Sequence, residues 1–171
     1  MPYQFRTATL ADVPILCLHR RRMFEDMGHR DPQLLSRMAE LFTEWVSDRI
    51  KNQTYLAWVA VEEKQQIVAS AGLWLVDWPP HVMGPEGPRG YILNIFTVTE
   101  HRRQGLARQL TQLCIEACRE RHIAFVALHA SEHGRSLYES LGFVPSNEMR
   151  IKLTSEFESL QEQAHDTLLH G

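Results

Sequence analysis

The stretch YILNIFTVTEHRRQGLA, residues 91–107, decides the fold of this chain. Its first part, Tyr91–Val98, is dense in β-branched and aromatic residues and predicts a buried strand. The residues after it predict an amphipathic helix, because apolar side chains recur at helical spacing: Leu106, Leu110, Leu113, Cys114 and Ala117. The polar turn R-R-Q-G-L-A, residues 102–107, therefore joins the end of a strand to the start of a helix.

This turn predicts a phosphate-binding site. The first N–H groups of a helix have no intrahelical partner and lie at the positive end of the helix dipole, so they bind anions. Gly105 and Ala107 have little or no side chain, which lets a ligand approach the main chain closely. Arg102, Arg103 and Arg108 add positive charge around the turn. A nucleotide-binding P-loop is a competing interpretation, but the turn lacks the Gly-Lys-Ser/Thr that a P-loop requires.

A second motif, S-L-Y-E-S-L-G-F at residues 136–143, follows at the distance that one acetyltransferase family shows. Together the two motifs resemble the Gcn5-related N-acetyltransferase (GNAT) superfamily. The pyrophosphate loop of that family reads [Q/R]-x-x-G-x-[G/A], and Arg102, Gly105 and Ala107 fill its three specified positions. The second motif is similar to the family's l-Y-e-k-l-G-F signature. The alternative is a basic turn before an ordinary helix, with a packed Tyr138 in the next one.

The resemblance covers residues 3–153 and implies a single α/β (α+β) domain, residues 1–153. Its mixed central sheet is flanked by helices, and the fourth and fifth strands splay apart to hold coenzyme A. The pattern predicts strands at 3–8, 55–62, 66–76, 91–98, 123–129 and 149–153, and helices at 9–27, 32–52, 105–121 and 132–141. Residues 154–171 form a tail with a thin apolar stripe, which could pack on the domain, mediate a homodimer contact or stay disordered.

The resemblance implies an acetyl-CoA-dependent N-acetyltransferase that transfers its acetyl group directly to an amine, expected to be a small molecule. A non-catalytic module that binds or senses acyl-CoA is the alternative. The main chain of 96–98 would bind pantetheine and the acetyl carbonyl, and the loop would bind the pyrophosphate. Ser131 stands where the family often has asparagine, and Arg135 either meets the adenosine end or is a solvated charge. The implied cofactor-binding residues are Phe96, Thr97, Val98, Arg102, Arg103, Gln104, Gly105, Leu106, Ala107, Arg108, Ser131 and Arg135.

Two residues are candidates for catalysis. Tyr138 matches the family tyrosine whose hydroxyl points at the CoA sulfur, and an unperturbed phenol keeps its proton at pH 7 and can give it to the departing thiolate. A tyrosine with a locally satisfied hydroxyl is the alternative. Asn94 is the single polar side chain, apart from the phenol of Tyr91, in 91–95. It can orient a water or the incoming amine but cannot accept a proton, and a buried, satisfied amide is equally compatible with the sequence.

The general base and the acceptor site are less defined. Glu25, Asp26 and His29 are remote base candidates that also suit a surface, and a desolvated amine needs no dedicated base. The acceptor side comprises the two N-terminal helices and the loop 77–90. Its arginines and aromatic side chains could bind an amine that carries a carboxylate. Alternatively, the arginines form a solvated helix face and the tryptophans belong to the core. These residues are Arg20, Arg21, Arg22, Trp74, Trp78 and His81.

Composition limits the partners and the location. The net charge of −3 and pI near 6.3 give no bulk attraction to nucleic acid or to an anionic membrane. Three cysteines are too few for a disulfide framework, and Cys114 and Cys118 lack the partners of a metal site. The N-terminus lacks a signal-peptide apolar core, and no apolar run is long enough to span a bilayer. We therefore expect a cytoplasmic protein without a metal, a nucleic-acid partner or a membrane partner.

Overall fold

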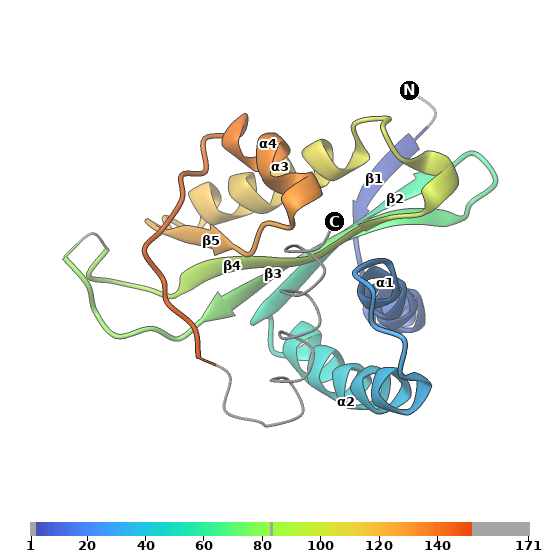
Figure 1. The fold of residues 1–171 in the computed structure, drawn as a ribbon. Coiled ribbons are helices and arrows are strands. Elements are labelled where there is room, and N and C mark those ends of the chain that lie inside the picture. The colour runs from blue at the N-terminus through green and yellow to red at the C-terminus, as the bar shows by residue number, and fades with distance from the viewer. Residues whose placement is uncertain (1–2, 83, 152–171) are drawn as a thin grey trace, which may run out of the picture.

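The computed structural model describes residues 3–82 and 84–151. Figure 1 shows a twisted sheet with helices on both faces. The strands are β1 (Tyr3–Thr7), β2 (Tyr55–Glu62), β3 (Ile67–Val76), β4 (Arg89–Thr97) and β5 (Val126–Leu128). The α-helices are α1 (Val13–Asp26), α2 (Pro32–Lys51), α3 (Leu106–Glu120) and α4 (Arg135–Glu139). Short 3-10 turns are η1 (Leu10–Asp12), η2 (Thr99–His101) and η3 (Glu132–Gly134).

The sheet has the strand order β1-β2-β3-β4-β5. Neighbours are antiparallel from β1 to β4, whereas β4 and β5 are parallel. A parallel pair needs a crossover connection, and α3 supplies it. Helices α1 and α2 cover one face of the sheet, and α3 and α4 cover the other (Figure 1). The predicted mixed sheet flanked by helices is confirmed.

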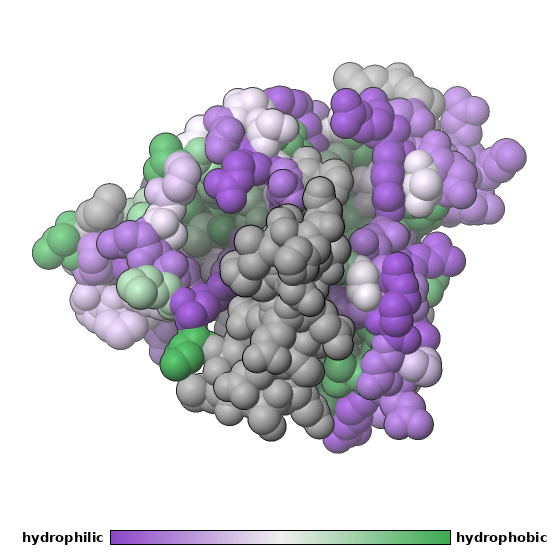
Figure 2. All heavy atoms as spheres, viewed as in Figure 1, coloured by the Kyte–Doolittle hydropathy of each residue, from purple (hydrophilic) through white to green (hydrophobic). Residues whose placement is uncertain are grey.

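Each face of the sheet has its own apolar core. On one face the stripe of α3 packs on β3 and β4 through Leu106, Leu110, Cys114 and Ala117. On the other face, side chains of α1 and α2 pack on β2, among them Leu16, Phe42 and Val46. The outward sides of α1 and α2 are mostly hydrophilic (right of Figure 2). The helices therefore lie on the sheet with their apolar sides buried and their polar sides in solvent, as amphipathic sequences predict.

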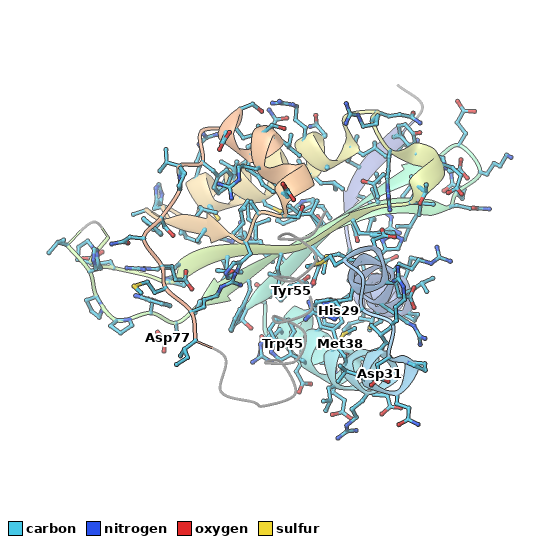
Figure 3. All side chains as sticks on the ribbon, in the orientation of Figure 1. His29, Asp31, Met38, Trp45, Tyr55 and Asp77 are labelled. Carbon is cyan, nitrogen blue, oxygen red and sulfur yellow. The ribbon has the colours of Figure 1, made fainter. Side chains whose placement is uncertain are left out.

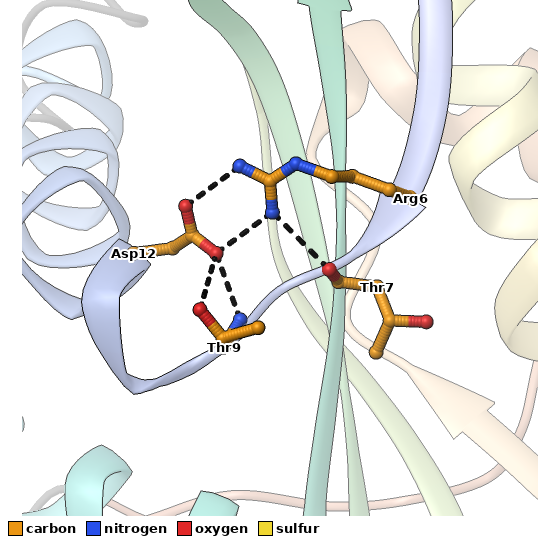
Figure 4. Close-up of polar contacts among 4 residues, drawn as sticks. All are labelled: Arg6, Thr7, Thr9 and Asp12. Atoms are coloured by element: carbon orange, nitrogen blue, oxygen red, sulfur yellow. Dashed lines mark hydrogen bonds and ion pairs between the residues drawn. The ribbon is translucent and has the colours of Figure 1, made fainter.

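The start of α1 is fastened to β1 by a charged network (Figure 4). Asp12 Oδ2 accepts from the Thr9 main-chain N–H at 2.8 Å, as the acidic residue of a capping box does. Arg6 donates to both Asp12 oxygens at 2.8 Å. Hydrogen bonding from the Arg6 guanidinium lowers the pKa of the Asp12 carboxyl to about 2. The network therefore fixes the angle at which α1 leaves the sheet.

The C-terminal part departs from the sequence prediction. Residues 149–151 form no strand, and Met149 and Ile151 are 94% and 81% exposed. Their alternation with charged residues suits a half-buried strand, but a strand also needs a neighbouring edge and a core, and these side chains contact neither. Strand β5 and helix α4 are shorter than predicted. Residues 152–153 of the predicted strand and the tail 154–171 lie outside the described residues.

The three cysteines, Cys17, Cys114 and Cys118, are free thiols and all are buried. Burial raises the pKa of each thiol, that of Cys118 to about 11. Over the described residues no group of three or more His, Cys, Asp or Glu side chains is arranged to hold a metal ion. None of the helices described here has the length and apolarity to cross a bilayer.

Candidate active site

The turn 102–105 gives α3 an unusual start. Arg103 and Gly105 have φ of +63° and +81°, in the left-handed region. A Cβ added at Gly105 would meet nothing within 4 Å, so the glycine is required by the backbone conformation rather than by space. Over the described residues the main-chain N–H groups of 103–108 have no hydrogen-bond acceptor within the chain. Six consecutive free donors at a helix N-terminus form a cradle for an anion such as pyrophosphate.

The three arginines around this cradle make different contacts. Arg102 donates through Nε to Thr97 O at 3.0 Å and forms an ion pair with Asp26, so it ties the loop to β4 and to α1. Arg108 donates through Nη2 to Ser140 Oγ at 2.6 Å, which holds the end of α4 beside the start of α3. Arg103 is exposed and has no such contact in the described chain. Arg103 is therefore the side chain of the three that can still reach a phosphate.

Tyr3 holds the same loop from β1. Its hydroxyl donates to Gln104 Oε1 at 2.7 Å and also contacts His101 Nδ1 at 2.9 Å. Gln104 was predicted to bind the cofactor, and its side-chain oxygen is used within the chain. Its contribution to the cradle is therefore its main-chain N–H.

Strands β4 and β5 leave a gap beside the cradle. They pair only from Gly90 to Ile92 of β4, opposite Val126 to Leu128 of β5, and then separate. Among the described residues, the rest of β4, residues 93–97, thus has no partner strand on that side. The predicted splay of the fourth and fifth strands is confirmed.

The end of β4 determines which main-chain groups face this gap. Val98 N–H donates to Val68 O at 2.9 Å, and Val98 O accepts from His101 N–H at 2.9 Å. Because bonded and non-bonded pairs alternate in an antiparallel ladder, the N–H of Thr97 points away from β3. Thr97 therefore presents the free donor here, whereas the N–H of Val98 is used by the sheet and that of Phe96 faces β3.

Asn94 lies at a bulge in β4. Leu93 pairs with Gly72 and Phe96 with Ser70, so Asn94 and Ile95 stand opposite one residue of β3, and Asn94 has φ of +56°. Its side chain is 8% exposed. Asn94 Nδ2 donates to Tyr55 Oη at 3.0 Å, and its Oδ1 accepts from Arg20 Nη1. The amide is thus satisfied by chain groups, with one N–H and one lone pair left for a ligand.

Tyr55 explains a glycine on the neighbouring strand. A Cβ at Gly72 would lie 1.8 Å from Tyr55 Oη, so the absence of a side chain lets the phenol lie across the sheet to reach Asn94. The ring also meets Trp45 of α2 edge-on, with centroids 5.4 Å apart (Figure 3). Complete burial raises the pKa of Tyr55, so its hydroxyl is protonated at neutral pH.

Tyr138 lies on α4, partly buried. Its ring packs edge-on against Phe143 with centroids 6.1 Å apart, and a Cβ at Gly134 would come within 2.9 Å of the ring. Its hydroxyl has no hydrogen-bond partner among residues 3–82 and 84–151. Burial raises the pKa of Tyr138, which keeps the phenol protonated at neutral pH. Ser131 Oγ accepts from Gly134 N–H at 3.2 Å, and Arg135 is exposed.

The three residues considered as a general base at the end of the first helix are either paired with an arginine or exposed to solvent. Glu25 pairs with Arg21 at 3.0 Å, and Asp26 pairs with Arg102. His29 is exposed, and its ring meets that of Phe24 edge-on. None of the three is therefore directed at the bulge of β4.

Sequence reasoning missed His19 of α1. Its Nδ1 lies 2.9 Å from Ser70 Oγ, its ring centroid lies 4.9 Å from that of Phe96, and burial lowers its pKa to about 4. Its Nε2 is buried and has no partner in the described chain. The side chain borders a groove of about 530 Å³ between α1 and the ends of β3 and β4. At neutral pH His19 is neutral and a weak base.

The fold and the free N–H groups at the start of α3 are those of an α/β domain able to bind an anionic ligand, and the comparisons give the family. The profile of the Acetyltransferase (GNAT) family matches residues 19–143. A GCN5-related N-acetyltransferase from Ralstonia eutropha is 36% identical, with a TM-score of 0.81 over 88% of this chain and 98% of that one. A predicted acetyltransferase from Clostridium acetobutylicum, solved with acetyl-CoA, is 28% identical, with a TM-score of 0.80 over 89% and 96%. The search of curated proteins gave no match. This chain belongs to the GNAT acetyltransferase family.

Proposed function

We propose that this protein transfers the acetyl group of acetyl-CoA directly to the amino group of a small acceptor. The observation that carries the proposal is the run of free N–H groups at 103–108 beside the gap between β4 and β5. A pyrophosphate on this run would direct the pantetheine arm along 93–97, past the free N–H of Thr97. Arg103 would add charge at the pyrophosphate, and Ser131 and Arg135 would border the arm and the adenosine end.

Acetyl-CoA supplies an acetyl thioester, and the chain would bind and polarise it. A main-chain donor on β4 would stabilise negative charge that develops on the carbonyl oxygen, an effect of roughly 2.7–4 kcal/mol in other enzymes. The amine nitrogen forms a bond to the carbonyl carbon while the bond from carbon to sulfur breaks. Tyr138 would give its proton to the thiolate, since its hydroxyl has no partner in the described chain and its raised pKa keeps the phenol protonated at neutral pH.

Direct transfer is favoured over an acyl-enzyme because the thiols are inaccessible. Cys17 lies under α2, Cys114 and Cys118 lie in the core beneath α3, and the pKa of each is raised. No carboxylate or histidine identified above is placed to take the amine proton. We infer that the acceptor loses this proton to water as it is desolvated.

The test is acetyl-CoA-dependent release of CoA by the purified full chain with a panel of small primary amines. If the protein transfers the acetyl group, the release of CoA should depend on the amine, and mass spectrometry should detect the acetylated amine. A rise in melting temperature with acetyl-CoA but no amine-dependent release would instead identify a non-catalytic acyl-CoA-binding module.

A further inference from the structure

Arg20 of α1 is a half-buried cation beside the bulge of β4. Its Cζ lies 5.0 Å from the centroid of Phe24 and 4.7 Å from that of Phe42. Its Nη1 donates to Asn94 Oδ1. Its Nε is buried and has no hydrogen-bond partner in the described part of the chain. Arg20 therefore keeps a buried N–H donor that no group of the described chain uses.

No acidic side chain neutralises Arg20 within residues 3–82 and 84–151. The ion pairs there join Arg6 to Asp12, Arg21 to Glu25, Arg37 to Glu40, His101 to Glu62 and Arg102 to Asp26. The titratable groups that act on the charge of Arg20 are Tyr55 and Cys17, both neutral at pH 7 because their pKa values are raised. A buried charge without a counter-ion is unfavourable. An anionic ligand would remove that cost.

The neighbouring arginines differ from Arg20. Arg21 is paired with Glu25 at 3.0 Å and contacts Ser36 Oγ at 3.4 Å. Arg22 is exposed at the groove beside His19. Of the three consecutive arginines, Arg20 is thus the one that is half-buried without an opposite charge.

We propose that Arg20 binds a carboxylate of the acceptor, so that the acceptor is a small amino acid or a related amino carboxylate. This inference rests on the proposed function and names its substrate class. The guanidinium contacts Asn94, so a carboxylate held there has its amine a few bonds away, near the bulge and the free edge of β4. A guanidinium also has the planar fork that a carboxylate matches. One unneutralised cation suits a monoanion better than a phosphate monoester, which carries about −1.5 to −2 at pH 7.

The test compares matched amines with the full-length protein. The probes are the L-amino acids, β-alanine and γ-aminobutyrate, together with the amide and the decarboxylated amine of each, and phosphoethanolamine. We expect at least one amino carboxylate to be acetylated with kcat/KM about 100-fold above that of its amide, since charged hydrogen bonds would be lost in the amide. Arg20→Met should remove this preference, mainly through a higher KM for the amino carboxylate.

Arg22→Met is the matched control, because it removes the same charge two residues further along α1 and should leave the preference intact. An unchanged rise in melting temperature with acetyl-CoA shows that Arg20→Met is folded. If that variant does not fold, Arg20→Lys keeps the charge, loses the fork and should reduce the preference. A second measurement needs no turnover: the acetylated amino carboxylate, or any amino carboxylate added with CoA, should raise the melting temperature of the wild type and not of Arg20→Met.

Equal rates with amides, a preference for phosphoethanolamine, or no effect of any amino carboxylate on rate or melting temperature would overturn the assignment. Release of CoA with neutral amines only would overturn it while the transferase function stands. A rise in melting temperature with amino carboxylates that depends on Arg20, without release of CoA, would retain the anion site and contradict the transferase function.

Discussion

Replacing Gly105 by valine should damage the cofactor cradle without unfolding the domain. The φ of +81° lies in the left-handed region, and a Cβ would meet nothing within 4 Å. The cost is therefore conformational, about 1–2 kcal/mol or more for a residue with a Cβ. For a domain of this size each kcal/mol lowers the melting temperature by about 2–4 °C. The folded state should survive with a modestly lower melting temperature.

The effect on binding should be larger than the effect on folding. If the turn relaxes, N–H groups of 103–108 no longer converge on one anion. Loss of two hydrogen bonds to a charged group, at about 1.5–3 kcal/mol each, weakens binding by about 100-fold or more. At an acetyl-CoA concentration of about 100 Kd, the wild type gains about 2.7 kcal/mol, which is a rise of about 5–11 °C. A variant weakened about 100-fold gains about 0.4 kcal/mol at that concentration, or about 1–2 °C.

Thermal unfolding with and without acetyl-CoA measures both quantities. Gly28→Val is the matched control, because Gly28 also has a positive φ, of +95°, and open space around its Cβ. It should lower the melting temperature of the free protein and leave the rise with acetyl-CoA unchanged. A folded Gly105→Val protein with a full rise would refute the phosphate cradle. Equal losses of the rise in both variants would show a general effect of strain.

Three further predictions concern catalysis, packing and pH. Tyr138→Phe keeps the ring against Phe143 and should lower turnover by about 10²–10⁴-fold. The rise in melting temperature with acetyl-CoA should change little. Normal turnover with weaker acetyl-CoA binding would make the hydroxyl a cofactor contact. Gly72→Ala places a Cβ 1.8 Å from Tyr55 Oη. It should lower the free energy of unfolding, measured by urea denaturation, by about 1–3 kcal/mol. An unchanged free energy of unfolding would mean that Tyr55 can move aside. The pKa of Asp12 falls from 3.8 to about 2 on folding, so its contribution of about 2 kcal/mol is complete above about pH 5 and is lost as the pH falls through about 2. Asp12→Asn should remove that part of the pH dependence of urea unfolding, and an unchanged profile would assign it to other carboxyls.

The strand, turn and helix of residues 91–121 could be predicted from the sequence because their signals are local. A strand, a turn with Gly105 and an amphipathic helix are adjacent in the chain, and α3 begins at the residue after that glycine. The bounds of β2 were also predicted correctly, from its run of apolar residues. The strand predicted at 149–153 was wrong over residues 149–151, because the alternation of apolar residues does not show whether a neighbouring strand is available for pairing.

The acceptor side depends on contacts between distant segments, which a single sequence does not reveal. Asn94 meets Tyr55 and Arg20, residues 39 and 74 positions away. A signal for Arg20 was nonetheless present, since it continues the buried stripe of Val13, Leu16 and Cys17 at helical spacing. A charged residue on the apolar face of a helix indicates a function for that charge.

The buried cysteines make this protein convenient to assay. Buried thiols with a raised pKa react slowly with disulfide dyes and alkylating reagents. A chromogenic disulfide reagent can therefore follow the liberated cofactor thiol continuously, with little background colour from the folded enzyme. The same three side chains become labelled only when the domain opens, so the rate of alkylation reports local opening of α1 and α3 without any added probe.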